Sequence, residues 1–92
     1  MDQQRIVITV VGKDTVGIIA RVCTYLAESN INILDLNQSI LQGFFNMMLI
    51  ADIAGSIVPF DRVQDELKEL GERMGLDIKT QREEIFEMMH RI

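Results

Sequence analysis

The chain has 92 residues, of which 48% are hydrophobic and 25% are charged, and its formal net charge is -5. This length fits one domain with a modest core, and the composition is typical of a globular protein rather than a disordered one. The acidic balance, with only 9 Lys and Arg residues, disfavours nucleic acid and anionic membrane surfaces as partners.

Residues 5–11 predict a β-strand that is apolar on both sides. The side chains alternate between two faces, Ile6, Ile8 and Val10 on one and Val7, Thr9 and Val11 on the other. Because neither set is polar, we expect a central strand that is covered on both faces.

Residues 12–22 predict a tight loop and the start of a helix. Asp14 or Thr15 is expected to cap this helix by accepting a hydrogen bond from a backbone amide. Gly17 would allow another group to approach the backbone, or the helix to pack closely on the strand, or both. Free amides beside the Asp14 carboxylate would suit a small zwitterion, with its carboxylate on the amides and its ammonium near Asp14.

The first helix is expected to bury one apolar stripe, formed by Ile19, Val22, Cys23 and Leu26. Cys23 is interpreted as a buried structural residue, because no histidine lies near it in sequence to activate it as a nucleophile. This single cysteine cannot form an internal disulfide, which agrees with a reducing compartment. Asn30 is predicted to end the helix in a left-handed conformation.

Two further strands, residues 31–41 and 44–53, are predicted to pair as an antiparallel hairpin around Gln42-Gly43. The earlier strand becomes polar along its length, which suits the edge of a sheet. The later one is mainly apolar on both faces, which suits the centre.

Residues 60–74 predict a second helix that follows Pro59 and ends at Gly75. Its apolar stripe consists of Phe60, Val63, Leu67, Leu70 and Met74. The opposite, acidic side is interpreted as solvated surface. A fourth strand follows from Leu76, buried on one side only.

Residues 83–92 predict a short helical tail with one apolar face, formed by Ile85, Met88, Met89 and Ile92. His90 is the only histidine and has no second ligand at metal spacing. We interpret it as a surface residue and predict neither a metal nor a cofactor.

This order of elements predicts an α+β fold, a ferredoxin-like βαββαβ sandwich with a four-stranded antiparallel sheet and two helices on one face, followed by the helical tail. The spatial order of strands is expected to be four-one-three-two. Two helices leave the other face bare and apolar, so we expect a second copy of the chain to cover it. Pairing through a strand edge is the alternative geometry.

Two motifs in this framework resemble the ACT domain family of small ligand-binding regulatory modules. The segment Gly12-Lys13-Asp14-Thr15-Val16-Gly17-Ile18-Ile19 looks like the loop signature of the family, and Asn30-Ile31-Asn32-Ile33-Leu34-Asp35 resembles its entry into the second strand. The likeness extends to Arg82 and is greatest to stand-alone bacterial and archaeal members, which look like the ACT halves of the glycine-cleavage transcriptional regulator. Val16 stands where the family often has proline, which predicts a less rigid loop.

The resemblance implies that a ligand, usually an amino acid, lies at a dimer interface between the loop before the first helix and the second strand of a neighbour. In this chain the matching positions are Asp14, Thr15, Val16, Gly17 and Ile18, together with Asn30 and Asn32. Considered without the resemblance, Asp14 is better explained as a helix cap, and the two asparagines as turn residues.

Other functions are open to a chain of this topology. An acylphosphatase needs an arginine in the phosphate-cradling loop, where this chain has Asp14 and only Lys13 nearby, and no pairing of nucleophile and base is visible, so we do not expect an enzyme. An RNA-recognition module needs basic residues on its third strand, and residues 44–51 have none. A structural dimerisation or protein-interaction module without a ligand stays open.

The sequence therefore predicts one ACT-like domain over residues 1–92, with residues 83–92 as a helical extension. It is expected to form a homodimer that binds an amino acid or similar small molecule and regulates an unknown protein in trans. No apolar stretch approaches the roughly 20 residues of a membrane span, and residues 1–5 are too polar for a signal peptide, so the expected location is cytoplasmic.

Overall fold

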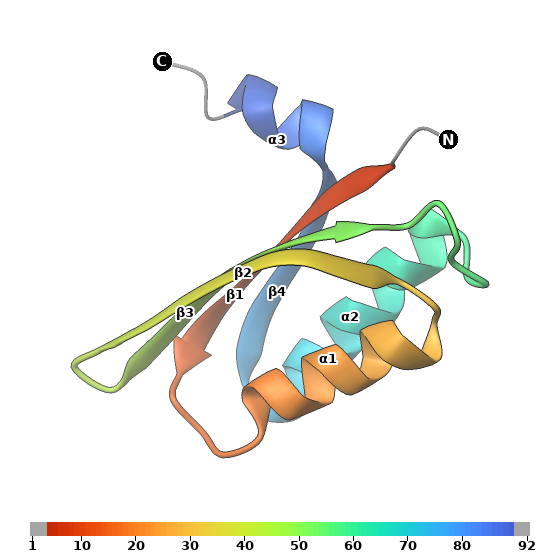
Figure 1. Ribbon diagram of the computed structural model, residues 1–92. Helices are drawn as coiled ribbons and strands as arrows, with labels where there is room; N and C mark the ends of the chain where they lie inside the picture. The colour runs from red at the N-terminus through yellow and green to blue at the C-terminus, as the bar shows by residue number, and fades with distance from the viewer. Residues whose placement is uncertain (1–3, 90–92) are drawn as a thin grey trace.

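The computed structural model describes residues 4–89 and contains a four-stranded antiparallel sheet with helices on both sides (Figure 1). The elements follow in the order β1 (Arg5–Lys13), α1 (Ile18–Glu28), β2 (Asn32–Leu41), β3 (Phe44–Asp52), α2 (Phe60–Met74), β4 (Leu76–Arg82) and α3 (Glu83–Met89). The strand order is β2-β3-β1-β4. The predicted ferredoxin-like topology is confirmed, with β1 and β3 in the centre.

The β2–β3 hairpin is defined by its turn. Gln42 and Gly43 both have positive φ angles, 52° and 81°, which is the conformation of the tight hairpin turns whose twist matches that of the strands. This turn pairs Leu41 with Phe44. The register then shifts by one residue between Ile33 and Asp35, which changes the partners of the first residues of β2.

Both ends of α2 lie where the sequence predicts them. Pro59 is the N-cap, and Gly75 ends the helix in the left-handed conformation with φ 73°, which glycine adopts without steric cost. The predicted apolar stripe faces the sheet, with Val63, Leu67 and Leu70 buried and Phe60 and Met74 partly buried.

The stripe of α1 is rotated slightly from its predicted position. The fully buried residues are Ile18, Val22 and Leu26, whereas Ile19 and Cys23 are half-buried. Cys23, predicted to be a buried structural residue, is thus only partly buried. The helix begins at Ile18, and a spacing of four residues from that position places Val22 and Leu26, rather than Cys23, at the centre of the interface.

The core lies between the sheet and the α1–α2 layer. The inward residues of the central strands are Ile6, Ile8 and Val10 on β1 and Phe45, Met47, Leu49 and Ala51 on β3. On the edge strand β4, Leu76, Ile78 and Thr80 are buried while the residues between them are not. The prediction that β4 is buried on one side only is confirmed.

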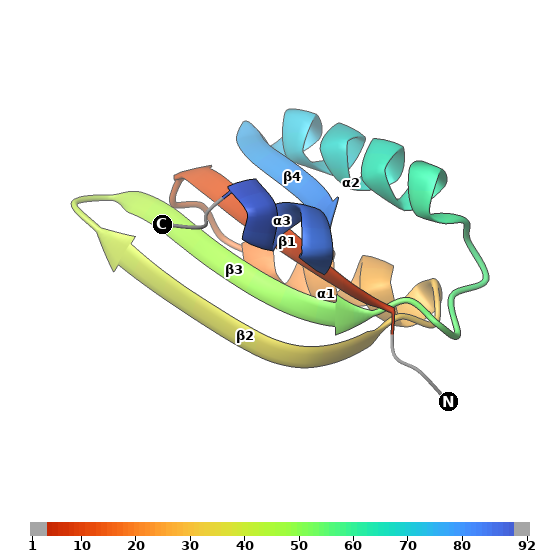
Figure 2. The same ribbon diagram turned by 90° about the horizontal axis from the view of Figure 1, so that it is seen from above.

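The short helix α3 lies on the other face of the sheet, opposite α1 and α2 (Figure 1). Its Met89 Sδ accepts a hydrogen bond of 3.2 Å from Gln81 Nε2, and Glu83 pairs with Arg5 at 3.2 Å. Val7 on that face is only 3% exposed, whereas the β2–β3 hairpin extends beyond α3 (Figure 2). Coverage of β1 on both faces is thus confirmed at Val7 and wrong at Val11, which is 46% exposed.

The prediction of a short helical tail is confirmed by α3. Ile85, Met88 and Met89 are all exposed. Ile92 and His90, the other residues in the predictions for this tail, lie outside the described residues.

Candidate functional site

The loop between β1 and α1 lies against the tip of the hairpin. The backbone N–H of Asp14 donates to the carbonyl of Gly43 at 2.8 Å, and the side chains of Asp14 and Thr15 are exposed. Val16 is 98% exposed. The loop therefore presents its side chains to solvent and uses its backbone to contact the hairpin.

The predicted helix cap was wrong. The N-cap of α1 is Gly17, and no side chain caps the helix. A capping side chain has to stand directly before the first helical residue, and Asp14 and Thr15 come too early for a helix that begins at Ile18. Within residues 4–89, the Asp14 carboxylate makes no hydrogen bond or ion pair.

The backbone conformation at position 17 favours glycine. Its φ angle is 90°, and a Cβ at this position would meet nothing within 4 Å. The interpretation that Gly17 permits close packing of helix on strand was therefore wrong for this chain. The open space leaves room for another group to approach the backbone at the start of α1.

Asn30 lies at the other end of α1 and ends the helix, as predicted, with φ 60°. Its N–H donates to the carbonyl of Ala27 and that of Ile31 donates to Leu26, which together form a Schellman motif. The Asn30 side chain donates from Nδ2 to the carbonyl of Gly55 at 2.7 Å. Asn30 therefore acts as a turn residue in this chain.

Asn32 opens β2 beside a small hollow of about 320 Å³. The hollow is lined by Ala27, Asn30, Ile31, Asn32, Asp52 and Gly55. Asn32 is exposed and pairs across the hairpin with Asp52. This end of the molecule thus combines two amide side chains with a carboxylate.

Asp52 is a candidate site residue that sequence reasoning missed. Its Oδ1 accepts hydrogen bonds of 2.9 Å from the backbone N–H groups of Gln4 and Ala54, and these donors lower the pKa of its carboxyl group. Counting back from the Gln42-Gly43 turn would place Ile53 opposite Asn32. The irregularity between Ile33 and Asp35 brings Asp52 there instead, and no residue in the sequence marks that irregularity.

The two groups of predicted site residues are separated by the whole of α1. This helix has 11 residues and is therefore about 16 Å long, with Asp14 to Ile18 at its start and Asn30 and Asn32 beyond its end. One chain does not bring the two groups together. A small ligand could contact both only between two copies.

The rest of the described chain adds two observations. Within residues 4–89, no three His, Cys, Asp or Glu side chains gather in a way that could hold a metal ion. The helices found there are too short or too polar to cross a membrane.

Comparison with known proteins decides the family. Residues 4–81 match the model of the ACT domain. The chain belongs to the ACT domain family. This ACT domain chain is 56% identical over 86 residues to a UPF0237 protein of Bifidobacterium longum. The aligned region covers 94% of this chain and 96% of that protein.

Two solved structures are similar to this ACT domain chain. An ACT domain protein from Streptococcus pneumoniae has a TM-score of 0.80 and 34% identity, with 94% of this chain and 97% of that chain covered. A protein described provisionally as a glycine cleavage system transcriptional repressor has a TM-score of 0.77 and 28% identity, with 89% of this chain but only 47% of that chain covered. The predicted likeness to one half of such a regulator is confirmed.

Proposed function

We propose that this ACT domain chain is a regulatory module that binds an amino acid between two copies of itself and acts on another protein in trans. The observation that carries the proposal is the state of the family's signature loop. The Asp14 carboxylate has no partner within residues 4–89, and α1 has no side-chain cap. The fold therefore leaves both the Asp14 carboxylate and the first backbone amides of α1 available to a ligand.

The chemistry at the start of α1 suits a zwitterion. The first amides of a helix have no intrahelical partner and carry a partial positive charge, so they attract a carboxylate. Asp14 would then accept the ligand's ammonium group. Gly17, with free space around its Cβ position, would allow the ligand to approach the backbone closely.

The second half of the proposed site comes from a neighbouring copy. Asn30 and Asn32 border the hollow that also contains Asp52, and their amide groups can donate to and accept from a polar ligand. Because these residues lie at the far end of α1 from Asp14, the ligand would bridge two chains and link its own binding to their association. We assign this module no catalytic activity, and we expect it to work in the cytoplasm.

Thermal unfolding in the presence of each of the twenty amino acids tests the proposal. A ligand that binds the folded form raises the unfolding midpoint by mass action, and light scattering on the same samples gives the oligomeric state. The single variant Asp14→Ala should abolish the shift and leave the dimer intact. Asp65→Ala, which removes an exposed carboxylate from α2, is the matched control and should shift as the wild type does.

Two results would count against this proposal. Unchanged ligand affinity in Asp14→Ala would show that the site is elsewhere. A well-folded dimer that responds to none of the twenty compounds would favour a protein-interaction module without a ligand.

A further inference from the structure

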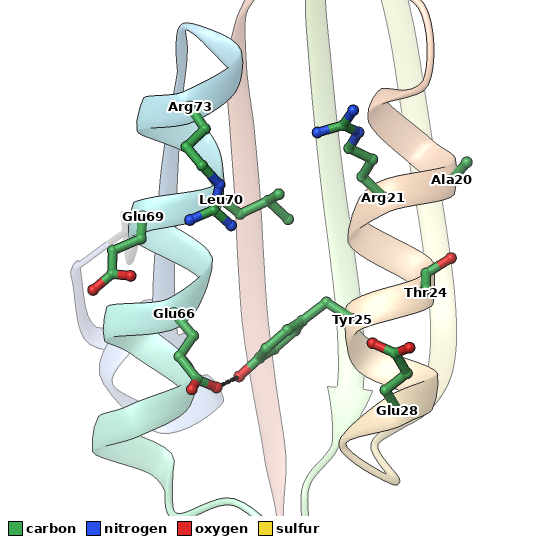
Figure 3. Close-up of a pocket in the computed structure, with 9 residues that line it drawn as sticks. All are labelled: Ala20, Arg21, Thr24, Tyr25, Glu28, Glu66, Glu69, Leu70 and Arg73. Carbon is green, nitrogen blue, oxygen red and sulfur yellow. Dashed lines mark hydrogen bonds between the residues drawn. The ribbon is translucent and has the colours of Figure 1, made fainter.

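A groove of about 500 Å³ separates α1 from α2 on the outer side of the helix layer (Figure 3). It is lined by Ala20, Arg21, Thr24, Tyr25, Glu28, Glu66, Glu69, Leu70 and Arg73. Its volume lies within the usual range of small-molecule sites. The groove contains none of the residues of the proposed amino acid site.

The two ends of the groove carry opposite charges. The guanidinium groups of Arg21 on α1 and Arg73 on α2 both extend toward the space between the helices, while Glu28 and Glu66 lie toward the other end (Figure 3). Glu69 also lines the groove, on α2 between Glu66 and Arg73, with its carboxylate on the side away from α1 (Figure 3). Within residues 4–89, neither arginine forms an ion pair. Arg21 and Glu28 on α1 are seven residues apart, as are Glu66 and Arg73 on α2, which corresponds to two turns and about 10 Å.

The charges on α1 are not explained by the stability of that helix. Arg21 lies near the beginning of α1 and Glu28 is its last residue, and the helix has no acidic residue in its first turn and no basic residue in its last turn. A helix dipole favours the reverse arrangement, with anions at the start and cations at the end. The two charged side chains therefore weaken the helix slightly while they give the groove its polarity.

Tyr25 connects the helices across the groove at the end where Glu28 and Glu66 lie (Figure 3). Its hydroxyl donates to Glu66 Oε1 at 2.6 Å, and Arg62 Nη2 lies 3.2 Å from Glu66 Oε2. These two donors hold the Glu66 carboxylate in place and lower its pKa. The Tyr25 ring and the buried Leu70 contribute apolar surface to the groove (Figure 3).

We propose that this groove binds a short zwitterionic peptide of about three residues. Its terminal carboxylate lies between Arg21 and Arg73, and its terminal ammonium lies near Glu28 and Glu66. Three extended residues span about 10 Å, which matches the separation of the charged positions along the helices. The middle of the peptide packs on Tyr25 and Leu70. This second site is independent of the amino acid site proposed at Asp14.

Fluorescence titration with trialanine and with Ala-Phe-Ala tests this site directly. Tyr25 is the only tyrosine and the chain has no tryptophan, so the intrinsic emission reports on the groove alone. We expect saturable binding of both peptides. N-acetylated and C-amidated trialanine should each bind at least about tenfold more weakly, since each lacks one charged end.

Variants of the protein test where the terminal carboxylate of the peptide binds. The double variant Arg21→Gln/Arg73→Gln should weaken trialanine at least about tenfold, and Arg21→Lys/Arg73→Lys should recover part of the affinity. Lys68→Gln/Lys79→Gln removes the same amount of charge from exposed positions outside the groove and should bind as the wild type does. Unfolding midpoints verify that each variant is folded.

Three results would overturn the groove site: no binding of either free peptide at millimolar concentration, equal binding of the blocked peptides, or unchanged affinity in the double arginine variant. Asp14→Ala should leave trialanine binding unchanged. This control separates a failure of the groove from a failure of the amino acid site.

Discussion

The two faces of the sheet differ sharply, although the same strands form both. On β1, Val10 is fully buried while its neighbour Val11 is 46% exposed, and on β3, Met47 is 3% exposed while Met48 is 42% exposed. Successive side chains of a strand point to opposite faces. Each pair therefore consists of two residues of the same type, one on each face of the sheet. The difference arises from the helices, because α1 and α2 cover one face and the short α3 covers only part of the other.

The part of the second face that α3 does not cover therefore exposes apolar side chains to solvent. Val11, Met48 and Phe44 are exposed there, and a trough of about 380 Å³ lies among residues of β1, β2 and β3. The exposed apolar side chains of α3, Ile85, Met88 and Met89, belong to the same side of the sheet. Several large apolar side chains exposed on one face of a sheet are typical of an interface. Within one chain, therefore, only one face of the sheet is fully covered.

The largest expected effect comes from shortening the two adjacent methionines separately. Met47→Ala should lower the free energy of unfolding by about 3 kcal/mol, because it leaves a cavity in the core. Met48→Ala should lower it by less than about 1 kcal/mol, because water already reaches that side chain. Urea unfolding at two protein concentrations measures both values and separates folding from association. Equal losses would contradict the contrast between the faces.

A charge on the bare face should act on association rather than on folding. Met48→Lys should raise the dimer dissociation constant at least about tenfold, because two copies would bring like charges into an apolar contact. Val7 lies on the same face, but it is buried, so Val7→Lys would disturb the fold as well. Sedimentation or light scattering over a dilution series gives the constant.

Ile57→Lys provides the matched control for this charge, because Ile57 is an exposed apolar residue in the loop before α2. It should leave association unchanged. If Met48→Lys also leaves the equilibrium unchanged, the sheet face is not the interface, and pairing through the edge of β2 becomes the better explanation.

The smallest expected effect concerns the covered side, where Tyr25 joins the two covering helices. Burial and the hydrogen bond to Glu66 raise the pKa of Tyr25 to about 12. Since this is the only tyrosine, the phenolate absorbance of the folded protein should titrate near that value. A midpoint near the ordinary value of about 10 would contradict the Tyr25–Glu66 contact.

The same shift predicts how stability depends on pH. The fold favours the neutral phenol, so this stabilisation is complete below about pH 10 and is lost as the pH rises through about 12. The loss should be at most about 1 kcal/mol, because Tyr25 is only half-buried and solvent screens it. Tyr25→Phe should lower the free energy of unfolding at neutral pH by about 1 kcal/mol and remove this pH dependence.

The fold was predictable because its signals are local. Pro59 and Gly75 bound α2 by backbone conformation, Gln42-Gly43 sets the hairpin, and Asn30 ends α1. The strands with two apolar faces are the central ones. Each of these signals depends on the intrinsic preference of one residue or on a short repeat, so no distant contact was needed to interpret it.

The site was less predictable because its residues are brought together by packing. Asp14 was expected to cap α1, but the left-handed turn at Gly17 delays the helix. Asp52 faces Asn32 only because β2 contains an irregularity. In the groove between α1 and α2, Tyr25 contacts Glu66, a residue 41 positions away in sequence. None of these contacts has a signature in the local pattern.

The sequence by itself determined the order of the elements, the position of most of their ends and the family to which the chain belongs. These follow from backbone preferences and from the alternation of apolar residues, which act over a few positions. Only the tertiary structure decided which face α3 covers, which carboxylate stands beside Asn32 and how the charges of α1 and α2 align. Those outcomes depend on side chains that meet across the fold, where packing rather than local preference selects the partners.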